Sequence, residues 1–294
     1  MYRGRFAPSP TGPLHLGSLI AAVASYLDAR HHRGRWSVRM EDLDPPREEA
    51  GAADRILTSL ERHGLIGDDA VLFQRHRADA YHAALQQLEG AGHLFSCACT
   101  RAALGPSGAC NGTCRQHRPD NGTLCATRVR VPPKTCIEFT DTLQGVQSEA
   151  LGAETPDFIL QRKDTLIAYQ LAVVVDDAFQ GITHVVRGSD LMASTPRQIF
   201  LQQRLGLSRP AYTHVPVITT PQGQKFSKQN KSSPLDDDRA GCNLRLALRF
   251  LGQPSPPARL RHPIDLLAHA AQAWTRNAIP AVLSIPAATV GIKG

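Results

Sequence analysis

A segment near the start of the sequence has residue types that suit the binding of a phosphate group. It runs from Arg5 to Ser18 and reads RFAPSPTGPLHLGS. Its prolines lack the amide hydrogen that a strand or helix needs, so the chain must turn before it enters a helix near Leu16. The first amides of a helix lack partners and lie at the positive end of its dipole, so a phosphate could bind there beside His15. The alternative is an ordinary proline-rich turn before a helix.

A second segment with phosphate-binding character follows much later in the sequence. It reads KFSKQ from Lys225 to Gln229. Two lysines three positions apart on a loop could bind nucleotide phosphates and stabilise the charge that develops as pyrophosphate leaves. An isolated pair of this kind is also typical of a solvated basic loop.

Four cysteines lie close together in the middle of the sequence: Cys97, Cys99, Cys110 and Cys114. Four thiolates in a tetrahedral arrangement suit a structural Zn²⁺. The C-x-C and C-x₃-C spacings depart from the commoner C-x₂-C, so unliganded thiols are the alternative. Three further cysteines stand alone and are expected to be small buried apolar residues: Cys125, Cys136 and Cys242.

The elements that must position these groups begin as strand, helix, strand. A short strand ends near Phe6, apolar residues at helical spacing predict a helix over 18–33, and an alternating strand follows over 36–40. This order predicts a parallel α/β sheet with a ligand crevice beyond the carboxyl ends of its strands. Further helices are predicted over 48–63, 77–89, 195–205, 241–251 and 265–277, with Thr195 as an N-cap. Short strands are predicted over 127–131, 135–139 and 184–188, and the apolar run 166–175 fits a central strand or a buried helix start.

The expected fold is therefore a Rossmann-like parallel sheet with helices on both faces. Its two halves are predicted to occupy residues 1–94 and 156–235. The cysteine-, glycine- and proline-rich residues 95–155 are interpreted as an inserted zinc-binding subdomain, and residues 236–294 as a short helical C-terminal part. We expect the tail from Ile279 to be loosely ordered.

Composition narrows the class of protein and its partners. The net charge of +7 and pI of about 9.2 suit a polyanionic partner such as nucleic acid, although charge also serves solubility. No apolar run approaches a membrane span, and no secretion signal precedes the first strand, so a cytoplasmic location without membrane contact is expected. In that compartment the cysteines are expected to be thiols or metal ligands.

Taken together, the two phosphate-binding segments resemble the signatures of the class I aminoacyl-tRNA synthetases in their glutamyl form. That family reads Arg-Phe-Ala-Pro-Ser-Pro-Thr-Gly followed by His-x-Gly-His, and later Lys-Met-Ser-Lys-Ser. Here Ser18 replaces the second His, Phe226 replaces Met, and Gln229 replaces the final Ser. The resemblance implies that His15, Lys225 and Lys228 act in catalysis and that Mg²⁺ accompanies ATP. It assigns these residues to the ATP site: Pro8, His15, Gly17, Ser18, Lys225 and Lys228.

The same resemblance implies a glutamate pocket formed by six residues: Arg5, Ala7, Ser9, Glu41, Tyr169 and Arg187. A guanidinium binds a carboxylate well, and the Glu41 carboxylate could bind the substrate ammonium. The segment RGSD over 187–190 resembles the family's Arg-Gly-Glu-Asp. A short relative of the family places a zinc site in the same region, where Cys110 takes a position that is often Tyr. One structural zinc per chain is therefore implied.

The sequence continues past Lys228 only to Gly294, which is too short for a large helical anticodon-binding region. This layout resembles the truncated relatives that activate glutamate without tRNA and transfer it to queuosine at the wobble position of tRNA(Asp). The implied partners are ATP, L-glutamate and the queuosine-bearing anticodon loop of tRNA(Asp), and we expect a monomer. One alternative is a truncated glutamyl-tRNA synthetase that charges a tRNA 3′ end. Another is a non-catalytic zinc-dependent RNA-binding protein.

Overall fold

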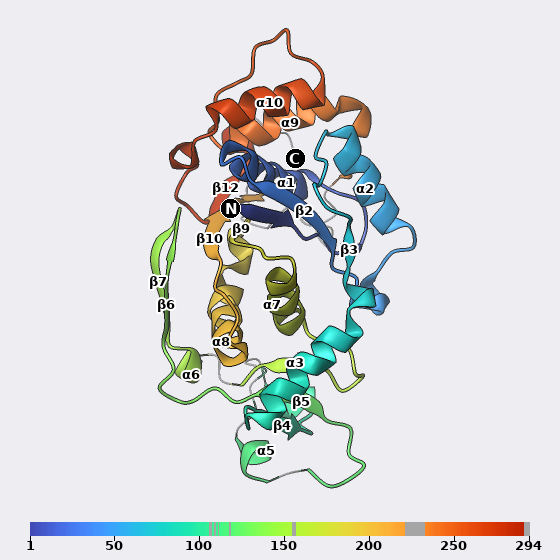
Figure 1. Cartoon of the computed structure of the whole chain (residues 1–294), viewed down its shortest axis with the longest axis vertical. Coiled ribbons are helices and arrows are strands. Elements are labelled where there is room, and N and C mark those ends of the chain that lie inside the picture. Colours follow the sequence, from blue (N-terminus) through green and yellow to red (C-terminus); the bar gives the residue numbers. More distant parts are fainter. Residues whose placement is uncertain are drawn as a thin grey trace.

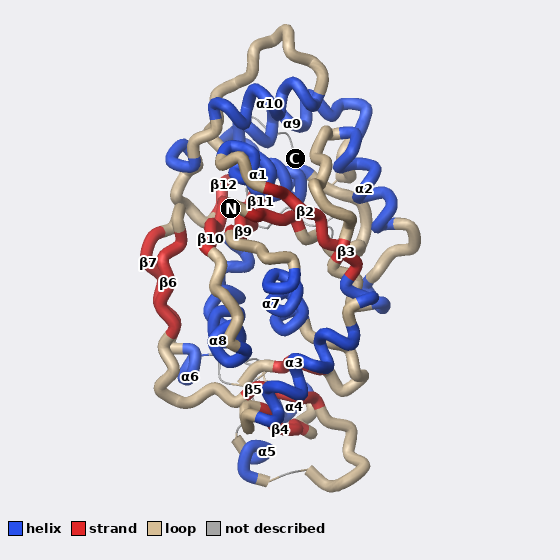
Figure 2. Tube along the Cα trace, in the orientation of Figure 1, coloured by secondary structure: helices blue, strands red, loops and turns tan. Residues whose placement is uncertain are grey.

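The computed structural model describes residues 1–105, 108, 110, 112–117, 119–154, 157–220 and 233–290. These residues form a twisted sheet with helices stacked on both of its faces and a smaller sheet at one end (Figure 1). The colouring by secondary structure in Figure 2 separates the main strands near the centre from the small sheet below them. The predicted α/β architecture is therefore confirmed.

The main sheet is built from parallel strands. β1 (Arg3–Phe6) pairs with β2 (Arg35–Met40), which pairs with β3 (Leu72–Phe73). β9 (His184–Gly188) pairs with β10 (Ala211–Val215), which meets β6 (Ile137–Asp141) in parallel at its end. β1 and β9 lie side by side, and the amide of Thr183 donates to the carbonyl of Arg3 at 3.0 Å. The strand order is thus β3-β2-β1-β9-β10-β6, and β7 (Gly145–Glu149) adds an antiparallel hairpin at the β6 edge.

Two hydrophobic cores lie on opposite faces of this sheet. One face packs against α1 (Leu16–His31), α9 (Ala240–Phe250) and α10 (Pro263–Ala273), with α2 (Ala52–Arg62) at its margin (Figure 1). The other packs against α3 (Ala78–Gly90), α7 (Tyr169–Phe179) and α8 (Thr195–Leu205). Side chains alternate along a strand, so Val186 enters the first core and its neighbour Val185 enters the second. Burial on both faces explains why two successive residues of β9, Val185 and Val186, are both apolar.

The inserted part forms a separate antiparallel sheet of β4 (Leu94–Cys97), β5 (Ala126–Val129) and β8 (Ile159–Gln161). The short helices α4 (Arg101–Leu104) and α5 (Thr113–Gln116) follow β4, and α6 (Leu151–Glu154) precedes β8. Between β5 and β8 the chain returns to the main sheet, because β6 pairs with β10. The domain boundaries at 94, 155 and 235 stay a prediction.

The structure decides between strand and helix for the run 166–175 and corrects the expected N-cap of α8. Most of the run 166–175 belongs to helix α7, which begins at Tyr169, packs against α3 and α8 and buries apolar residues around most of its circumference. The expected cap of α8 was wrong. A 3₁₀ helix over Ser189–Ser194 leads directly into α8, so Ser194 takes the cap position and Thr195 is already helical. The Thr195 hydroxyl is used in the site described below.

The C-terminal residues to Val290 are ordered, which corrects the expectation of a loose tail. β12 (Ser284–Pro286) pairs in parallel with β11 (Val217–Thr219), and the amide of Val217 donates to the carbonyl of Leu283 at 3.0 Å. Ile279 and Ile285 are buried. This segment therefore finds backbone partners and apolar contacts that composition alone does not reveal.

Further anchorage comes from Asp28 near the end of α1. Its carboxylate accepts hydrogen bonds from Trp274 Nε1 at 3.0 Å, from Arg276 Nη2 at 2.9 Å and from the Tyr2 hydroxyl. Within the described ranges, no helix combines the length and apolar character needed to cross a bilayer.

Candidate active site and zinc centre

A cavity of about 870 Å³ opens at the carboxyl ends of β1, β2 and β9. Its walls come from the loop after β1, the first turn of α1, the turn after β2 and the start of α7. Ligands of parallel α/β sheets bind at this edge, because the loops that follow the strands converge there. All the described residues assigned to ATP or glutamate from the sequence line the cavity: Arg5, Ala7, Pro8, Ser9, His15, Gly17, Ser18, Glu41, Tyr169 and Arg187.

The two lysines of the KFSKQ segment lie outside the described residues. Lys225 and Lys228 follow β11 in the sequence, and the described part of that element contributes Val217 and Ile218 to the cavity wall. The role assigned to these lysines stays a prediction.

His15 caps the helix that faces the cavity. Its backbone is extended at the N-cap position of α1, and its Nδ1 accepts from the amide of Ser18 at 3.2 Å. A Cβ on Gly17 would lie 3.1 Å from Cε1 and Nδ1 of the His15 ring, so glycine allows the ring to lie close to the helix start. The cap leaves the amides of Leu16 and Gly17 at the exposed, positive end of the helix dipole.

Arg5 lies at the base of the cavity in a buried network of alternating charges. Asp177 of α7 accepts from Arg5 Nε at 3.2 Å and from Arg39 Nη1 at 2.7 Å. Arg39 Nη2 in turn donates to Glu41 Oε1 at 3.2 Å. Burial by itself raises the pKa of the Asp177 carboxyl, but Arg5 and Arg39 outweigh it and lower that pKa. Asp177 and Arg39 therefore fix the positions of Arg5 and Glu41, two of the six residues assigned to the glutamate pocket.

The Glu41 carboxylate lines the cavity, where burial disfavours its charged form. Burial raises the pKa of its carboxyl, and the opposing effect of Arg39 and Arg5 does not cancel that rise. Its amide donates to the carbonyl of Pro8 at 2.9 Å, which ties the turn after β2 to the loop after β1. A substrate ammonium beside Glu41 would stabilise the charged carboxylate and so offset the effect of burial.

Arg187 closes the other side of the cavity from the end of β9. Its Nη1 donates to the Tyr169 hydroxyl at 3.3 Å, and its Nη2 donates to Thr195 Oγ1 at 2.8 Å. Its Nε donates to His214 Nε2 at 3.1 Å. Asp141 lies behind His214 and accepts from His214 Nδ1 at 2.7 Å. The structure thus places two arginines, one tyrosine and one glutamate around the same space.

Sequence reasoning missed four buried polar residues that hold this site together: Arg39, Asp141, Asp177 and His214. A signal existed for two of them. Arg39 interrupts the apolar strand β2, and Asp177 follows Asp176 in the apolar helix α7. Charged residues are rarely buried unless they are paired, so their place in apolar elements indicates partners elsewhere in the chain.

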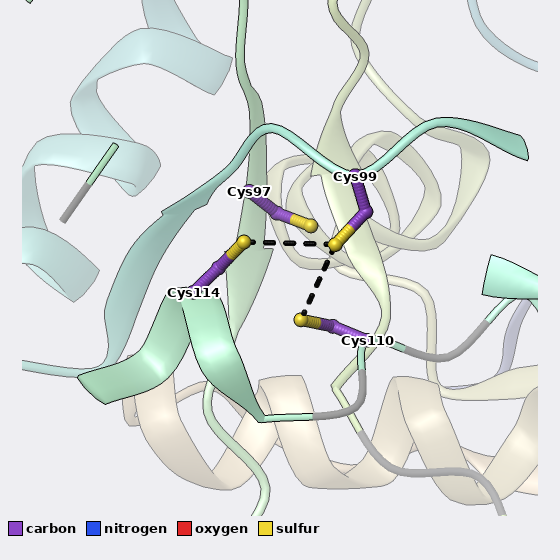
Figure 3. Close-up of side chains that lie close together, drawn as sticks. All are labelled: Cys97, Cys99, Cys110 and Cys114. Carbon is purple, nitrogen blue, oxygen red and sulfur yellow. Dashed lines mark hydrogen bonds between the residues drawn. The ribbon is translucent and has the colours of Figure 1, made fainter. Parts of the chain in front are cut away.

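The four clustered cysteines converge on one point, as Figure 3 shows. Cys97 is the last residue of β4 and Cys99 follows it by two positions, whereas Cys110 comes from the next loop and Cys114 from α5. Cys99 Sγ lies 3.8 Å from Cys110 Sγ and 3.6 Å from Cys114 Sγ.

The spacing and chemistry of these donors fit a zinc ion. Four sulfurs bound tetrahedrally at a Zn–S distance of about 2.3 Å would lie about 3.8 Å apart. All four sulfurs lie within 4.8 Å of one another. The expectation that the remaining three cysteines are buried was wrong, because Cys136 and Cys242 are exposed and Cys125 is only partly buried.

This combination of a parallel sheet, a crevice with a capped helix start and a cysteine-rich inserted sheet defines a class I tRNA synthetase catalytic domain. Residues 1–239 match the family of class I tRNA synthetases (E and Q), catalytic domain. The glutamate-tRNA synthetase from Elizabethkingia anophelis shares the fold with a TM-score of 0.81 at 24% identity, covering 98% of this chain and 69% of that chain.

Curated relatives give a narrower grouping. A glutamyl-Q tRNA(Asp) synthetase from Dechloromonas aromatica is 51% identical over 289 residues, covering 95% of this chain and 96% of the relative. One from Thiobacillus denitrificans is 52% identical over 286 residues, covering 94% of each chain. The chain belongs to the glutamyl-Q tRNA(Asp) synthetase family of class I ligases.

Proposed function

We propose that this enzyme activates L-glutamate with ATP, without tRNA, and transfers the glutamyl group to queuosine at the wobble position of tRNA(Asp). The observation that carries the proposal is the charge pattern of the cavity. Arg5 and Arg187 offer guanidinium groups, Glu41 offers a carboxylate, and the positive end of α1 opens onto the same space. An amino acid with a second carboxylate satisfies the first three groups, and a nucleotide phosphate satisfies the fourth.

In the first step, an oxygen of the substrate α-carboxylate bonds to the α-phosphorus of ATP, and pyrophosphate leaves. Arg5, Arg187 and Glu41 hold the glutamate by its charges while the start of α1 holds a phosphate near the carboxylate. Lys225 and Lys228 are proposed to stabilise the negative charge that gathers on the leaving pyrophosphate. Mg²⁺ bound with ATP would neutralise part of the phosphate charge. No covalent bond to the protein is required.

In the second step, a hydroxyl of the queuosine cyclopentene ring attacks the carbonyl carbon of glutamyl-adenylate, and AMP leaves. The acceptor is an anticodon loop, so its backbone phosphates must approach the cavity mouth. The net charge of +7 favours that approach. The four-cysteine cluster is proposed to hold one structural zinc that keeps β4, α5 and the intervening loop together. We further propose a monomeric, cytoplasmic enzyme.

Labelled glutamate distinguishes this reaction from charging of a 3′ end. The enzyme is incubated with ATP, labelled glutamate and tRNA(Asp) that carries queuosine but lacks its 3′-terminal adenosine. Transfer of label to this tRNA, and none to tRNA(Asp) without queuosine, is the expected result. Label that requires the 3′-terminal adenosine, or that enters tRNA(Glu), would instead indicate a truncated glutamyl-tRNA synthetase.

ATP–pyrophosphate exchange tests the first step alone. Exchange that depends on glutamate and proceeds without tRNA is expected, and it should fall by roughly 10²-fold or more in Lys228→Ala, the scale of losing one preorganised donor. Absence of glutamate-dependent exchange in the unaltered protein would contradict the proposal and favour a non-catalytic zinc-dependent RNA-binding protein.

A further inference from the structure

A buried chain of hydrogen bonds leads from β6 through β10 to Arg187 at the cavity wall. Asp141 and His214 are almost completely buried. Asp141 accepts from the amides of Leu143 and Gln144 at 3.0 and 2.9 Å, as well as from the His214 ring. Neither Asp141 nor His214 lines the cavity. Their effect on a ligand must therefore pass through Arg187.

The chemistry of the partners determines where the His214 proton lies. Arg187 Nε can only donate, so His214 Nε2, at 3.1 Å, must accept. The ring proton is then on Nδ1, where it donates to Asp141 at 2.7 Å. Burial lowers the pKa of the His214 imidazole, which agrees with a neutral ring. Asp141 thus selects one tautomer, and that tautomer gives Arg187 an acceptor.

Arg187 and Tyr169 continue this chain of hydrogen-bond donors to the cavity. Among the hydrogen bonds of the described residues, Arg187 uses four of its five N–H groups on His214, Tyr169, Thr195 and the carbonyl of Leu191. The fifth is on Nη1, the nitrogen that contacts the Tyr169 hydroxyl. That hydroxyl accepts from Arg187 at 3.3 Å. Burial raises the pKa of Tyr169, so the hydroxyl keeps its own proton to donate.

Building on the proposed function, we propose that Asp141 and His214 are positioning residues that make this end of the cavity a donor-only site and so select a carboxylate over an amide. A carboxylate only accepts hydrogen bonds, and it satisfies the N–H of Arg187 and the hydroxyl of Tyr169 together. The side-chain amide of glutamine presents an NH₂ group, which would face these donors without an acceptor. A site built in this way rejects the uncharged analogue because buried donors are left unpaired.

His214→Asn separates the two halves of the chain of hydrogen bonds. Asn is long enough to donate to Asp141 but too short to accept from Arg187. The expected result is a KM for glutamate raised by about 10-fold or more, with an unchanged KM for ATP, which matches the loss of a hydrogen bond to a charged group. The ratio of kcat/KM for glutamate to that for glutamine should fall as well. His214→Gln places an amide oxygen near Arg187 and should recover most of the loss.

A matched control is His63→Asn. His63 is also fully buried, bonds the carbonyl of Ser59 at 2.7 Å and does not line the cavity. It should lower the unfolding temperature without changing the KM for glutamate. Equal changes in the KM values for glutamate and ATP in His214→Asn, or no rescue by His214→Gln, would overturn the proposal.

A measurement on the unaltered protein tests the tautomer without any variant. Histidine ¹⁵N shifts should place the His214 proton on Nδ1 at neutral pH, and a proton on Nε2 would overturn the proposal. This result does not depend on catalysis. If the unaltered protein shows no glutamate-dependent exchange, the proposed function fails. If exchange is normal but the variants retain full selectivity, only the positioning role fails.

Discussion

Replacing Asp177 with Asn should destabilise the protein and weaken glutamate binding at the same time. The Asp177 carboxylate lies between Arg5 and Arg39, whose side chains are 4% and 0% exposed. Removing one partner of a buried ion pair costs about 3–5 kcal/mol, because the remaining charge stays desolvated. In Asp177→Asn, Arg39 would keep its ion pair with Glu41, but Arg5 would lose the carboxylate that it contacts.

The size of the expected thermal shift follows from the chain length. Unfolding entropy is about 2.1 cal/mol/K per residue, so a 294-residue chain changes by about 0.6 kcal/mol/K. A loss of about 3–5 kcal/mol therefore lowers the unfolding temperature by about 5–8 °C. Differential scanning calorimetry measures this shift directly. Because Arg5 also loses its partner, the KM for glutamate should rise about 10-fold, the effect of a displaced charged hydrogen bond.

Asp176→Asn provides a matched control on the same helix. Asp176 is fully buried and accepts from the Tyr81 hydroxyl at 2.6 Å and from Arg77 Nε at 3.1 Å, but it does not bond Arg5. We expect a comparable fall in unfolding temperature without a change in the KM for glutamate. An unfolding temperature of Asp177→Asn equal to that of the unaltered protein, or the same KM change in both variants, would refute the reasoning.

Three further outcomes are expected. Cys114→Ser should lower the zinc content measured by elemental analysis, whereas replacement of the exposed, isolated Cys242 by Ser should not; equal zinc in both would remove the proposed centre. The pKa of Glu41 is raised above its ordinary value of 4.5, so the KM for glutamate should rise as pH falls towards that pKa and Glu41 loses its charge, and Glu41→Gln should abolish this dependence. Hydrogen bonds from Arg276 and Tyr2 outweigh the effect of burial and lower the pKa of Asp28 below 3.8. Its contribution to stability is therefore complete above pH 3.8 and lost as pH falls through the lowered pKa. Urea unfolding should give Asp28→Asn a lower free energy of unfolding than the unaltered protein at neutral pH, and this difference should become smaller in acid.

Local signals in the sequence predicted the part of the site that is contiguous in the chain. The prolines of the first loop restrict its path, Gly12 allows the positive φ of 135° that the turn needs, and the loop, His15 and Gly17 lie where the motif indicates. The four cysteines are similarly local. All four lie between positions 97 and 114, so little of the chain separates them.

Contacts between residues far apart in the sequence could not be predicted. Arg39 and Asp177 come from β2 and α7 and meet only when that helix packs under the sheet, so neither residue indicates the other in a single sequence. The run 166–175 was ambiguous, because a helix covered on most sides and a central strand are both apolar throughout. Thr195 was misassigned because a preceding 3₁₀ helix leaves no sharp start at which a side chain can cap α8.

The pairing of β11 with β12 ties the completion of the cavity to the order of protein synthesis. Val217 and Ile218 line the cavity, yet the strand that covers their edge is formed by Ser284–Pro286. A nascent polypeptide that has reached only Thr219 has an unpaired edge at this wall. The enzyme can therefore acquire its finished wall only after translation has passed residue 286, and proteolytic loss of that strand would expose the edge again.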